Sequence, residues 1–380
     1  MPSRAPVRLS WINGPYQYDG AGNIKAIGTE SFAYDPISRL TSATLRGPDM
    51  VSMQTQTFGY DPYGNLTQTA KLGQTVFLPS AAKNQLDGLH YDSAGNIDIA
   101  GTLYYSYDAV GMLSAVRLGS QTAQPRIIYA YTADDERLFA FDVETNTTHW
   151  TLRGLNSKVL RDFKQTNATW SVERDYVYRD GLLLAAVKPG GAVEHYSLDH
   201  LGTPRLITDG AGVKIGYHVY WPFGEEWSPG NAQEGAPLKF TGHERDADPI
   251  GGNAPLDYMH ARYYGAGFGR FLSVDPVLNT KRAMAHPQSW NRYAYVEANP
   301  LNMTDPDGRN AQVTCRTIHT ASGQSTTNCT ATVVAQVIVH NAAERGVAQQ
   351  FAKNAQAYWN RQTVRGPNGE NIRFNVRTMS

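Results

Sequence analysis

The sequence predicts a mainly β protein: a spiralling antiparallel strip of β-hairpins, followed by a small α+β C-terminal segment. The first observation is composition. The 380 residues include 22 Tyr, 35 Gly and 20 Pro but only 18% charged residues, which is typical of aromatic strands joined by tight turns. The second observation is a short motif that recurs along the chain, because self-similarity of this kind indicates a repeat architecture.

The motif has the form aromatic-x-Tyr-Asp, then a turn, then Leu or Ile. Its five clear copies are YQYDGAGNI (16–24), FAYDPISRL (32–40), FGYDPYGNL (58–66), LHYDSAGNI (89–97) and YSYDAVGML (105–113). Weaker relatives begin near residues 129, 176 and 195. The spacing between copies is too irregular for propeller blades or β-helix coils, so it favours hairpins of variable length stacked into one winding sheet.

Each copy predicts one hairpin. Two aromatic residues at alternating positions share one face of a strand, and the Asp carboxylate then accepts backbone N–H bonds and opens a turn. A Gly three residues later supplies positive φ, and the aliphatic residue enters the next strand. Such Asp residues (Asp19, Asp61, Asp92 and Asp108) could also bind calcium, but the motif lacks the closely spaced oxygen ligands of a calcium site. We therefore interpret them as turn caps and predict no metal and no cofactor.

Charge and hydropathy narrow the class of protein. Lys plus Arg and Asp plus Glu both total 34, so no overall field favours nucleic acid or an acidic membrane. The chain has no run of 18 apolar residues that would span a bilayer, and its first residues lack the apolar run of a signal peptide. We expect a soluble piece of a longer polypeptide, with any export signal encoded elsewhere.

Longer motifs follow the repeats. They are SLDHLGTPRLITD (197–209), YWPFGE (220–225), LKFTGHERD (238–246), LDYMHARYYGAGFGRFLSVDP (256–276) and SWNRYAYVEANPLNMTDPDG (289–308). Together with the repeats, they resemble the YD, or RHS, repeats and the RHS-associated core of bacterial Rhs proteins, Tc-toxin C proteins and animal teneurins. The resemblance implies YD repeats over 1–190, an associated core over 191–309 and a variable C-terminal segment over 310–380.

In that family the strip forms a hollow shell, closed by the core, around a C-terminal cargo that is often a toxin. The resemblance therefore implies a partial shell whose partner is its own C-terminal effector segment, with a secretion machinery and an immunity protein as further possible partners. It also implies a secreted or cell-surface location, reached by a route that this chain does not encode. Two alternatives stay open: a cell-surface adhesin whose Tyr-rich strands bind glycans, and a remnant without active cargo.

Two Asp-Pro steps carry the candidate chemistry. Asp275 and Asp305 could work as acid and base, because two neighbouring carboxylates split their pKa values. Arg270 could keep one carboxylate charged or stabilise an oxyanion.

The resemblance places the scissile bond between Arg309 and Asn310, where the commonest family pattern has Leu in place of Arg309. An apolar side chain there would anchor the cut segment, whereas Arg309 is costly to bury. The alternative is that Asp-Pro-x-Gly is a plain type I turn that ends the core.

The composition changes after residue 310. Thr- and Val-rich strands around a polar loop predict a hairpin that places Cys315 opposite Cys329, as a disulfide if this part is exported and as free thiols if it is not. Residues 341–361 show the apolar stripe of an amphipathic helix. The segment lacks a recognisable catalytic arrangement and looks like the front of an incomplete domain.

Overall fold

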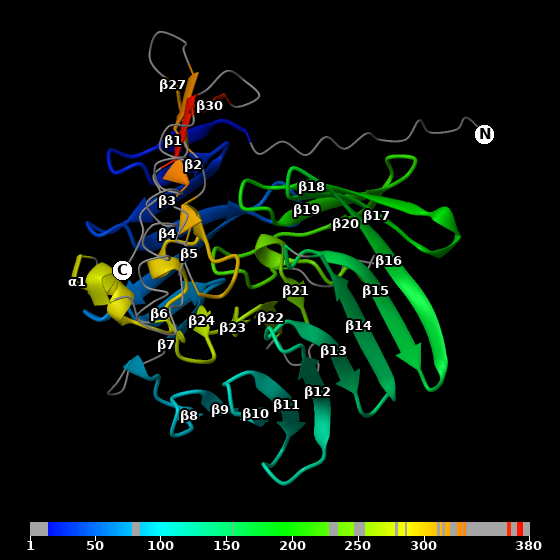
Figure 1. Cartoon of the computed structure of the whole chain (residues 1–380). Helices are drawn as coiled ribbons and strands as arrows, with labels where there is room; N and C mark the ends of the chain where they lie inside the picture. The colour runs from blue at the N-terminus through cyan, green and yellow to red at the C-terminus, as the bar shows by residue number, and fades with distance from the viewer. Residues whose placement is uncertain are drawn as a thin grey trace, which may run out of the picture. The chain divides into compact units, whose positions relative to one another are not determined.

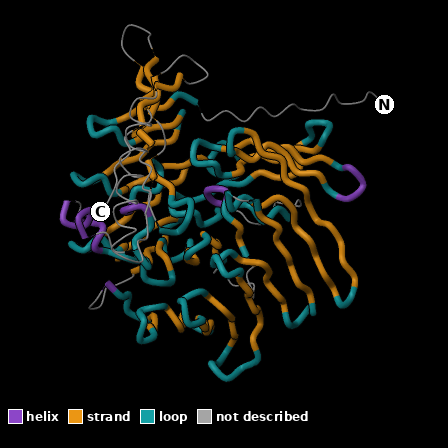
Figure 2. Tube along the Cα trace, in the orientation of Figure 1, coloured by secondary structure: helices purple, strands orange, loops and turns teal. Residues whose placement is uncertain are grey.

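The computed structural model describes residues 14–77, 84–154, 156–227, 235–246, 255–277, 280–285 and 287–309, together with short strands beyond residue 309. The chain divides into two compact units, Met1–Gln312 and Val313–Ser380. Antiparallel strands dominate the first unit, and its helices are short (Figures 1 and 2). The predicted fold class, a mainly antiparallel β-hairpin strip forming a partial shell, is confirmed.

The first sheet follows the chain without a crossover, since each strand pairs with its sequence neighbours. Its seven strands are β1 (Tyr16–Tyr18), β2 (Ile24–Ile27), β3 (Glu30–Tyr34), β4 (Leu40–Arg46), β5 (Met53–Tyr60), β6 (Leu66–Lys71) and β7 (Gln74–Phe77).

The second sheet continues the same pattern through thirteen strands, again in sequence order. Its strands are β8 (Leu89–Tyr91), β9 (Ile97–Ala100), β10 (Leu103–Tyr107), β11 (Leu113–Leu118), β12 (Pro125–Tyr131), β13 (Arg137–Asp142), β14 (Thr147–Arg153), β15 (Val159–Thr166), β16 (Thr169–Arg179), β17 (Leu182–Val187), β18 (Val193–Leu198), β19 (Pro204–Asp209) and β20 (Lys214–Tyr217). Because each strand pairs with its neighbours in the sequence, only short hairpin turns connect the strands. This explains why Gly and Asp are frequent between strands.

The motif aspartates cap the turns, as the sequence predicts. Asp19 Oδ1 accepts the N–H groups of Ala21 (2.9 Å) and Asn23 (2.8 Å), while Oδ2 accepts the side-chain amide of Asn23 (2.9 Å). Gly22 has φ +82°, the left-handed conformation that glycine adopts most readily. The same carboxylate contacts recur at Asp61 and Asp92.

The motif tyrosines join successive hairpins. Tyr34 Oη donates to the carbonyl oxygen of Ile24, the aliphatic residue that closes the preceding copy, over 2.9 Å. The equivalent bonds run from Tyr60 to Leu40 (2.7 Å), from Tyr107 to Ile97 (2.7 Å) and from Tyr131 to Leu113 (2.6 Å). In each of these hairpins the strand register shifts at the tyrosine, as at a β-bulge, which re-aims a side chain.

A third, four-stranded sheet lies between the first two sheets in Figure 1. Its strands are β21 (Glu244–Arg245), β22 (Leu256–Met259), β23 (Arg262–Gly265) and β24 (Arg270–Phe271). Tyr258, Tyr263 and Leu272 pack against the second sheet. Phe223 and Leu301, from neighbouring segments, pack against the first sheet. These segments therefore form the core that both sheets cover.

Short elements complete the first unit: η2 (Pro189–Gly191), η4 (Phe240–Gly242), α1 (Thr280–Ala285), η5 (Pro287–Trp290), η6 (Val296–Ala298) and β25 (Met303–Thr304). Strand β26 (Gln312–Val313) lies at the border of the two units. No helix in the described part of the chain is long and apolar enough to cross a bilayer.

The second unit is described only through five strands. They are β27 (Arg316–His319), β28 (Ser325–Asn328), β29 (Thr330–Ala331), β30 (Thr363–Arg365) and β31 (Asn371–Phe374). β27 and β28 form an antiparallel hairpin in which Arg316 pairs with Asn328, so the predicted hairpin is present. Cys315, Cys329 and the predicted helix over 341–361 lie outside the described residues.

Candidate functional site

Asp275 and Asp305 lie on either side of one buried guanidinium group. Arg262 Nη2, at the start of β23, is 3.3 Å from Asp305 Oδ2 and 3.5 Å from Asp275 Oδ2. The Arg262 side chain is 3% exposed, and its guanidinium carbon lies 3.5 Å from the centre of the Phe271 ring. The structure thus brings the two sequence-predicted carboxylates to one cation.

The electrostatics of this group follow from burial. Burial raises the pKa of Asp275, although the Arg262 guanidinium acts in the opposite direction. Burial also lowers the pKa of Arg262, against the attraction of Asp275 and Asp305, but an arginine stays protonated in a protein. Asp275 therefore holds a proton more readily than an ordinary aspartate does.

The segment that contains the predicted cleavage position is attached to the same side chains. Asp305 Oδ1 accepts the backbone N–H of Arg309 over 3.0 Å, and Asp307 Oδ1 accepts that N–H over the same distance. Asp305 is 3% exposed, whereas Arg309 is exposed. The Arg309 backbone is thus fixed while its side chain is not buried. Asn310 lies outside the described residues.

Three successive carbonyl groups of this loop each accept a hydrogen bond from the core. The Pro306 oxygen contacts His243 Nε2 (3.3 Å), the Asp307 oxygen accepts the N–H of Ala261 (3.2 Å), and the Gly308 oxygen accepts Nε–H of Arg262. We call residues 305–309 the clamped loop. Arg262 therefore contacts both carboxylates and the clamped loop.

Gly308 permits the close packing of the clamped loop. Its φ is +69°, and a Cβ atom placed on it would lie 2.2 Å from the carbonyl oxygen of Met259. No other residue type fits this position without displacing the backbone of the β22–β23 turn.

His243 contacts the clamped loop as a neutral imidazole. Burial lowers its pKa to about 3, and the neighbouring His260 adds to the effect. Because the Pro306 carbonyl can only accept, Nε2 carries the proton, and Nδ1 accepts from Thr241 Oγ1 over 2.8 Å. No sequence motif singles out His243, so its contact with the clamped loop was not predicted.

Arg270, the third residue predicted for the site, lies elsewhere. Its Nη2 donates to Asn65 Oδ1 (2.9 Å) and to the carbonyl oxygen of Asn84 (3.0 Å), and its guanidinium stacks on Tyr293. Arg262, not Arg270, contacts the two carboxylates. The sequence does carry a signal for this: Arg262 opens the otherwise apolar RYYG stretch, and a charge that a strand buries needs an anionic partner.

Among the described residues, no group of three or more His, Cys, Asp or Glu side chains could hold a metal ion. The acidic groups that contact the Arg262 guanidinium are the carboxylates of Asp275 and Asp305.

Comparison with known proteins identifies the architecture. The family model described as the teneurin YD-shell matches residues 17–301, which is more than half of the chain. The chain belongs to the teneurin YD-shell family. This confirms the resemblance that the repeat motifs and the core motifs indicate.

Relatives of this YD-shell chain include proteins named as toxins. It is 25% identical over 354 residues to the double-stranded DNA deaminase toxin A of Burkholderia cenocepacia (strain H111), a match that covers 78% of this chain and 22% of that protein. It is 34% identical over 129 residues to toxin subunit YenC2 of Yersinia entomophaga, covering 32% and 12%. The chain therefore spans less than a quarter of the length of these relatives.

Solved structures show the same fold. The TcdB2–TccC3–Cdc42 crystal structure matches the YD-shell chain with a TM-score of 0.61 and 22% identity, over 78% of this chain and 17% of that one. The Tc holotoxin pore of Photorhabdus luminescens matches with a TM-score of 0.60 and 21% identity, over 79% and 17%.

Proposed function

We propose that this chain is the closing part of a YD shell, which encloses a C-terminal effector segment and cuts the chain between Arg309 and Asn310. The single observation that carries the cutting step is the Arg262 guanidinium, which lies within 3.5 Å of both Asp275 and Asp305 and donates to the clamped loop. The enclosing role is supported by the family and by the toxin names of its relatives.

The proposed chemistry is hydrolysis of one peptide bond. Asp305 takes a proton from a water molecule, whose oxygen attacks the carbonyl carbon of Arg309. Asp275, which burial keeps protonated to higher pH than usual, donates its proton to the nitrogen of Asn310 as the carbon–nitrogen bond breaks. The products are a new carboxyl group at Arg309 and a new amino group at Asn310.

Arg262 has two roles in this scheme. Its positive charge offsets the repulsion between the two carboxylates. They can therefore lie close together without both being protonated. Its bond to the Gly308 carbonyl fixes the segment that leads into the scissile bond, so the bond is presented in one orientation.

Intact-mass analysis tests the cutting step. The wild-type chain should yield fragments 1–309 and 310–380, and the single variants Asp275→Asn and Asp305→Asn should each yield the intact chain. Asp180→Asn is the matched control, because the Asp180 side chain is 89% exposed and outside the site, so this variant should cut normally. A wild-type chain that stays intact would contradict self-cleavage but not encapsulation.

Encapsulation is tested separately by limited proteolysis. An effector segment held inside a shell should be digested more slowly in the full chain than as the isolated segment 310–380. The secretion machinery, the immunity protein and the location outside the cell belong to this proposal and follow from the family resemblance, which the toxin names of the relatives support.

A further inference from the structure

One residue, Arg292, holds both main-chain polar groups of Asp275. It lies two residues after η5. Its carbonyl oxygen accepts the backbone N–H of Asp275 over 3.0 Å, and its Nη2 donates to the Asp275 carbonyl oxygen. The same Arg292 carbonyl oxygen accepts Nη1–H of Arg262 over 3.0 Å. Arg292 therefore joins the main chain of Asp275 to the arginine that contacts both carboxylates of the site.

The Arg292 guanidinium has few partners of its own. Its Nε atom is buried but makes no hydrogen bond within the described part of the chain, and the guanidinium forms no ion pair there. A buried donor without a partner is unfavourable, and such exceptions in native structures call for a functional explanation. Among the described residues, the charge of Arg292 is therefore not offset by a paired carboxylate.

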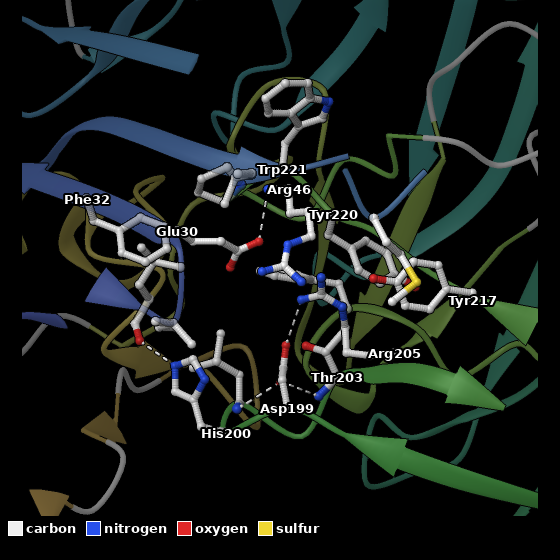
Figure 3. A pocket seen from close by; sticks show the side chains of 17 residues that line it. Glu30, Phe32, Arg46, Asp199, His200, Thr203, Arg205, Tyr217, Tyr220 and Trp221 are labelled. Atoms are coloured by element: carbon white, nitrogen blue, oxygen red, sulfur yellow. Dashed lines mark hydrogen bonds and ion pairs between the residues drawn. The ribbon is translucent and has the colours of Figure 1, made fainter. Parts of the chain in front are cut away.

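Other arginines of the first unit show the ordinary arrangement. A pocket of about 230 Å³ lies between strands β2–β4 and the β18–β19 turn, and Figure 3 shows Arg205 in it beside Asp199. The two charged groups are 3.3 Å apart. Because a carboxylate this close offsets the charge of Arg205, that charge acts mainly on its own partner. The charge of Arg292 has no such partner and acts on Asp275 instead.

Charged groups from three segments face the Asp275 carboxyl. Arg262 of β23 lies 3.5 Å from its Oδ2 and also contacts Asp305, Arg292 holds its main chain, and Asp307 belongs to the clamped loop. Burial raises the pKa of Asp275, the two arginines lower it, and Asp307 raises it. Arg292 and Asp307 therefore act on the protonation of Asp275 in opposite directions.

We propose that Arg292 is the positioning residue of Asp275: it fixes the main chain from which this side chain projects, and it sets the highest pH at which Asp275 can act as an acid. The inference rests on the proposed cutting step, in which Asp275 donates its proton to the nitrogen of Asn310. That acid works only while it is protonated, so the cutting rate should fall as pH rises past its pKa. We call the pH at which the rate has fallen to half its maximum the alkaline limit.

The test measures the rate of cutting against pH. The full chain is made in a short pulse of cell-free synthesis and then chased in buffers from about pH 4 to about pH 10, which cover both limbs of an acid–base reaction. Arg292→Gln should slow cutting about tenfold and raise the alkaline limit by about half a pH unit or more, because a cation that lowers the Asp275 pKa is gone. Arg292→Lys keeps the charge but not the planar fork, so it should slow cutting and leave the alkaline limit in place.

Asp307→Asn gives the opposite sign. It keeps an oxygen that can accept the Arg309 N–H, but it removes a charge that raises the Asp275 pKa, so the alkaline limit should fall. The change should be smaller than that of Arg292→Gln, because Asp307 is exposed and solvent screens its charge. Arg179→Gln is the control: the Arg179 side chain is 81% exposed at the end of β16, and its loss should change neither the rate nor the limit.

Two results would overturn the proposal. One is slower cutting by Arg292→Gln with the alkaline limit unmoved, which would show a structural role alone. The other is an upward shift of the limit that Arg179→Gln produces equally. Circular dichroism shows whether each variant is folded. If Arg292→Gln is not folded, Arg292→Lys decides, because a raised limit despite the retained charge, or a rate equal to that of the wild type, would contradict the proposal.

A wild-type chain that does not cut would contradict the proposed function, and the link between Arg292 and Asp275 is then tested directly. NMR of the full chain, isotopically labelled at the aspartate carboxyl carbons, follows the titration of Asp275, whose signal is the one that Asp275→Asn removes. Arg292→Gln should move that titration to higher pH. A titration that stays in place would overturn the inference whether or not the chain cuts.

Discussion

The phenol of Tyr107 donates a hydrogen bond to the main-chain carbonyl of Ile97, 2.7 Å away and ten residues earlier in the sequence. The donor belongs to one copy of the repeat motif and the acceptor closes the copy before it. Hydrogen bonds of this type, also made by Tyr34, Tyr60 and Tyr131, therefore connect neighbouring hairpins in addition to the strand ladder itself.

Removing this hydroxyl should loosen the strip. Tyr107→Phe should lower the free energy of unfolding by about 0.5–1.5 kcal/mol, because the Ile97 carbonyl loses its phenol partner. Urea denaturation of the full chain measures the change. Tyr63→Phe is the control, since Tyr63 is 71% exposed and should leave the midpoint unchanged. Equal destabilisation by both variants would show that the bond has no specific role.

The turns at the motif aspartates were predictable from the sequence. The Asp19 turn needs only an aspartate, a glycine with positive φ and a short span, all within one copy of the motif. The phenol bonds were not predicted, because they join different copies and depend on a register shift at the tyrosine that the sequence pattern does not show.

In the candidate site, too, some residues were predicted from the sequence and others were not. Asp275 and Asp305 were identified from their Asp-Pro steps and from the chemistry of carboxylate pairs. Arg262 was not, because its contacts with both depend on how β23 packs against segments 13 and 43 residues away in sequence. Arg270 lies closer to Asp275 in sequence, but it is held by Asn65 and Asn84. Sequence proximity was therefore a poor guide to which arginine would contact the carboxylates.

Substitution of Arg262 and substitution of Arg270 should have different effects on the cutting rate. Arg262→Gln should slow cutting by about 100-fold or more, because it removes the charge shared by the carboxylates. Arg270→Gln should lower stability but leave the cutting rate within about threefold, because its bonds are to Asn65 and Asn84. Pulse–chase analysis of intact and cut chain in cell-free synthesis measures both rates. If Arg270→Gln slowed cutting more than Arg262→Gln did, Arg270 and not Arg262 would be the arginine that acts at the site.

Asp162 should make stability fall as pH rises. Burial raises the pKa of this carboxyl from about 3.8 to about 7, with Glu244 adding to the effect, although Tyr176 Oη donates to it over 2.6 Å. The folded state therefore retains a proton that the unfolded state has lost between those values. The stabilising contribution is fully present below pH 3.8, declines by about 1.4 kcal/mol per pH unit and is gone above pH 7.

Comparison with Asp162→Asn isolates this effect, since asparagine keeps the shape without titrating. The difference in unfolding free energy between the variant and the wild type should grow in favour of the variant from pH 4 to pH 7 and then level off. A pH-independent difference, measured by urea denaturation, would contradict the raised pKa.

His243 should give the opposite pH dependence. Its pKa falls from about 6.5 to about 3 through burial, so the folded state excludes a proton that the unfolded state binds. The stabilising contribution is present above pH 6.5 and is lost as pH falls toward 3.

His243→Gln retains an N–H donor for the Pro306 carbonyl, so it should still cut. Between pH 6.5 and pH 3 its free energy of unfolding should fall less than that of the wild type. His243→Ala lacks that donor and should cut more slowly. His90→Gln is the control, because the His90 side chain is 64% exposed. If His243→Ala cut as fast as the wild type, the bond to Pro306 would have no part in holding the clamped loop.

Gly308→Ala should disrupt the clamped loop more than a positive φ alone explains. Alanine at φ +69° is strained by about 1 kcal/mol, and its Cβ would also lie 2.2 Å from the Met259 carbonyl oxygen, so the loop must move away from the β22–β23 turn. That movement breaks the Arg262 bond to the Gly308 carbonyl, so cutting should be lost while the sheets stay folded.

Gly181→Ala is the matched control: Gly181 has φ +80°, and a Cβ there would meet nothing within 4 Å. Intact-mass analysis and urea denaturation of both variants separate strain from collision, and equal effects on cutting would contradict the role of the Met259 contact.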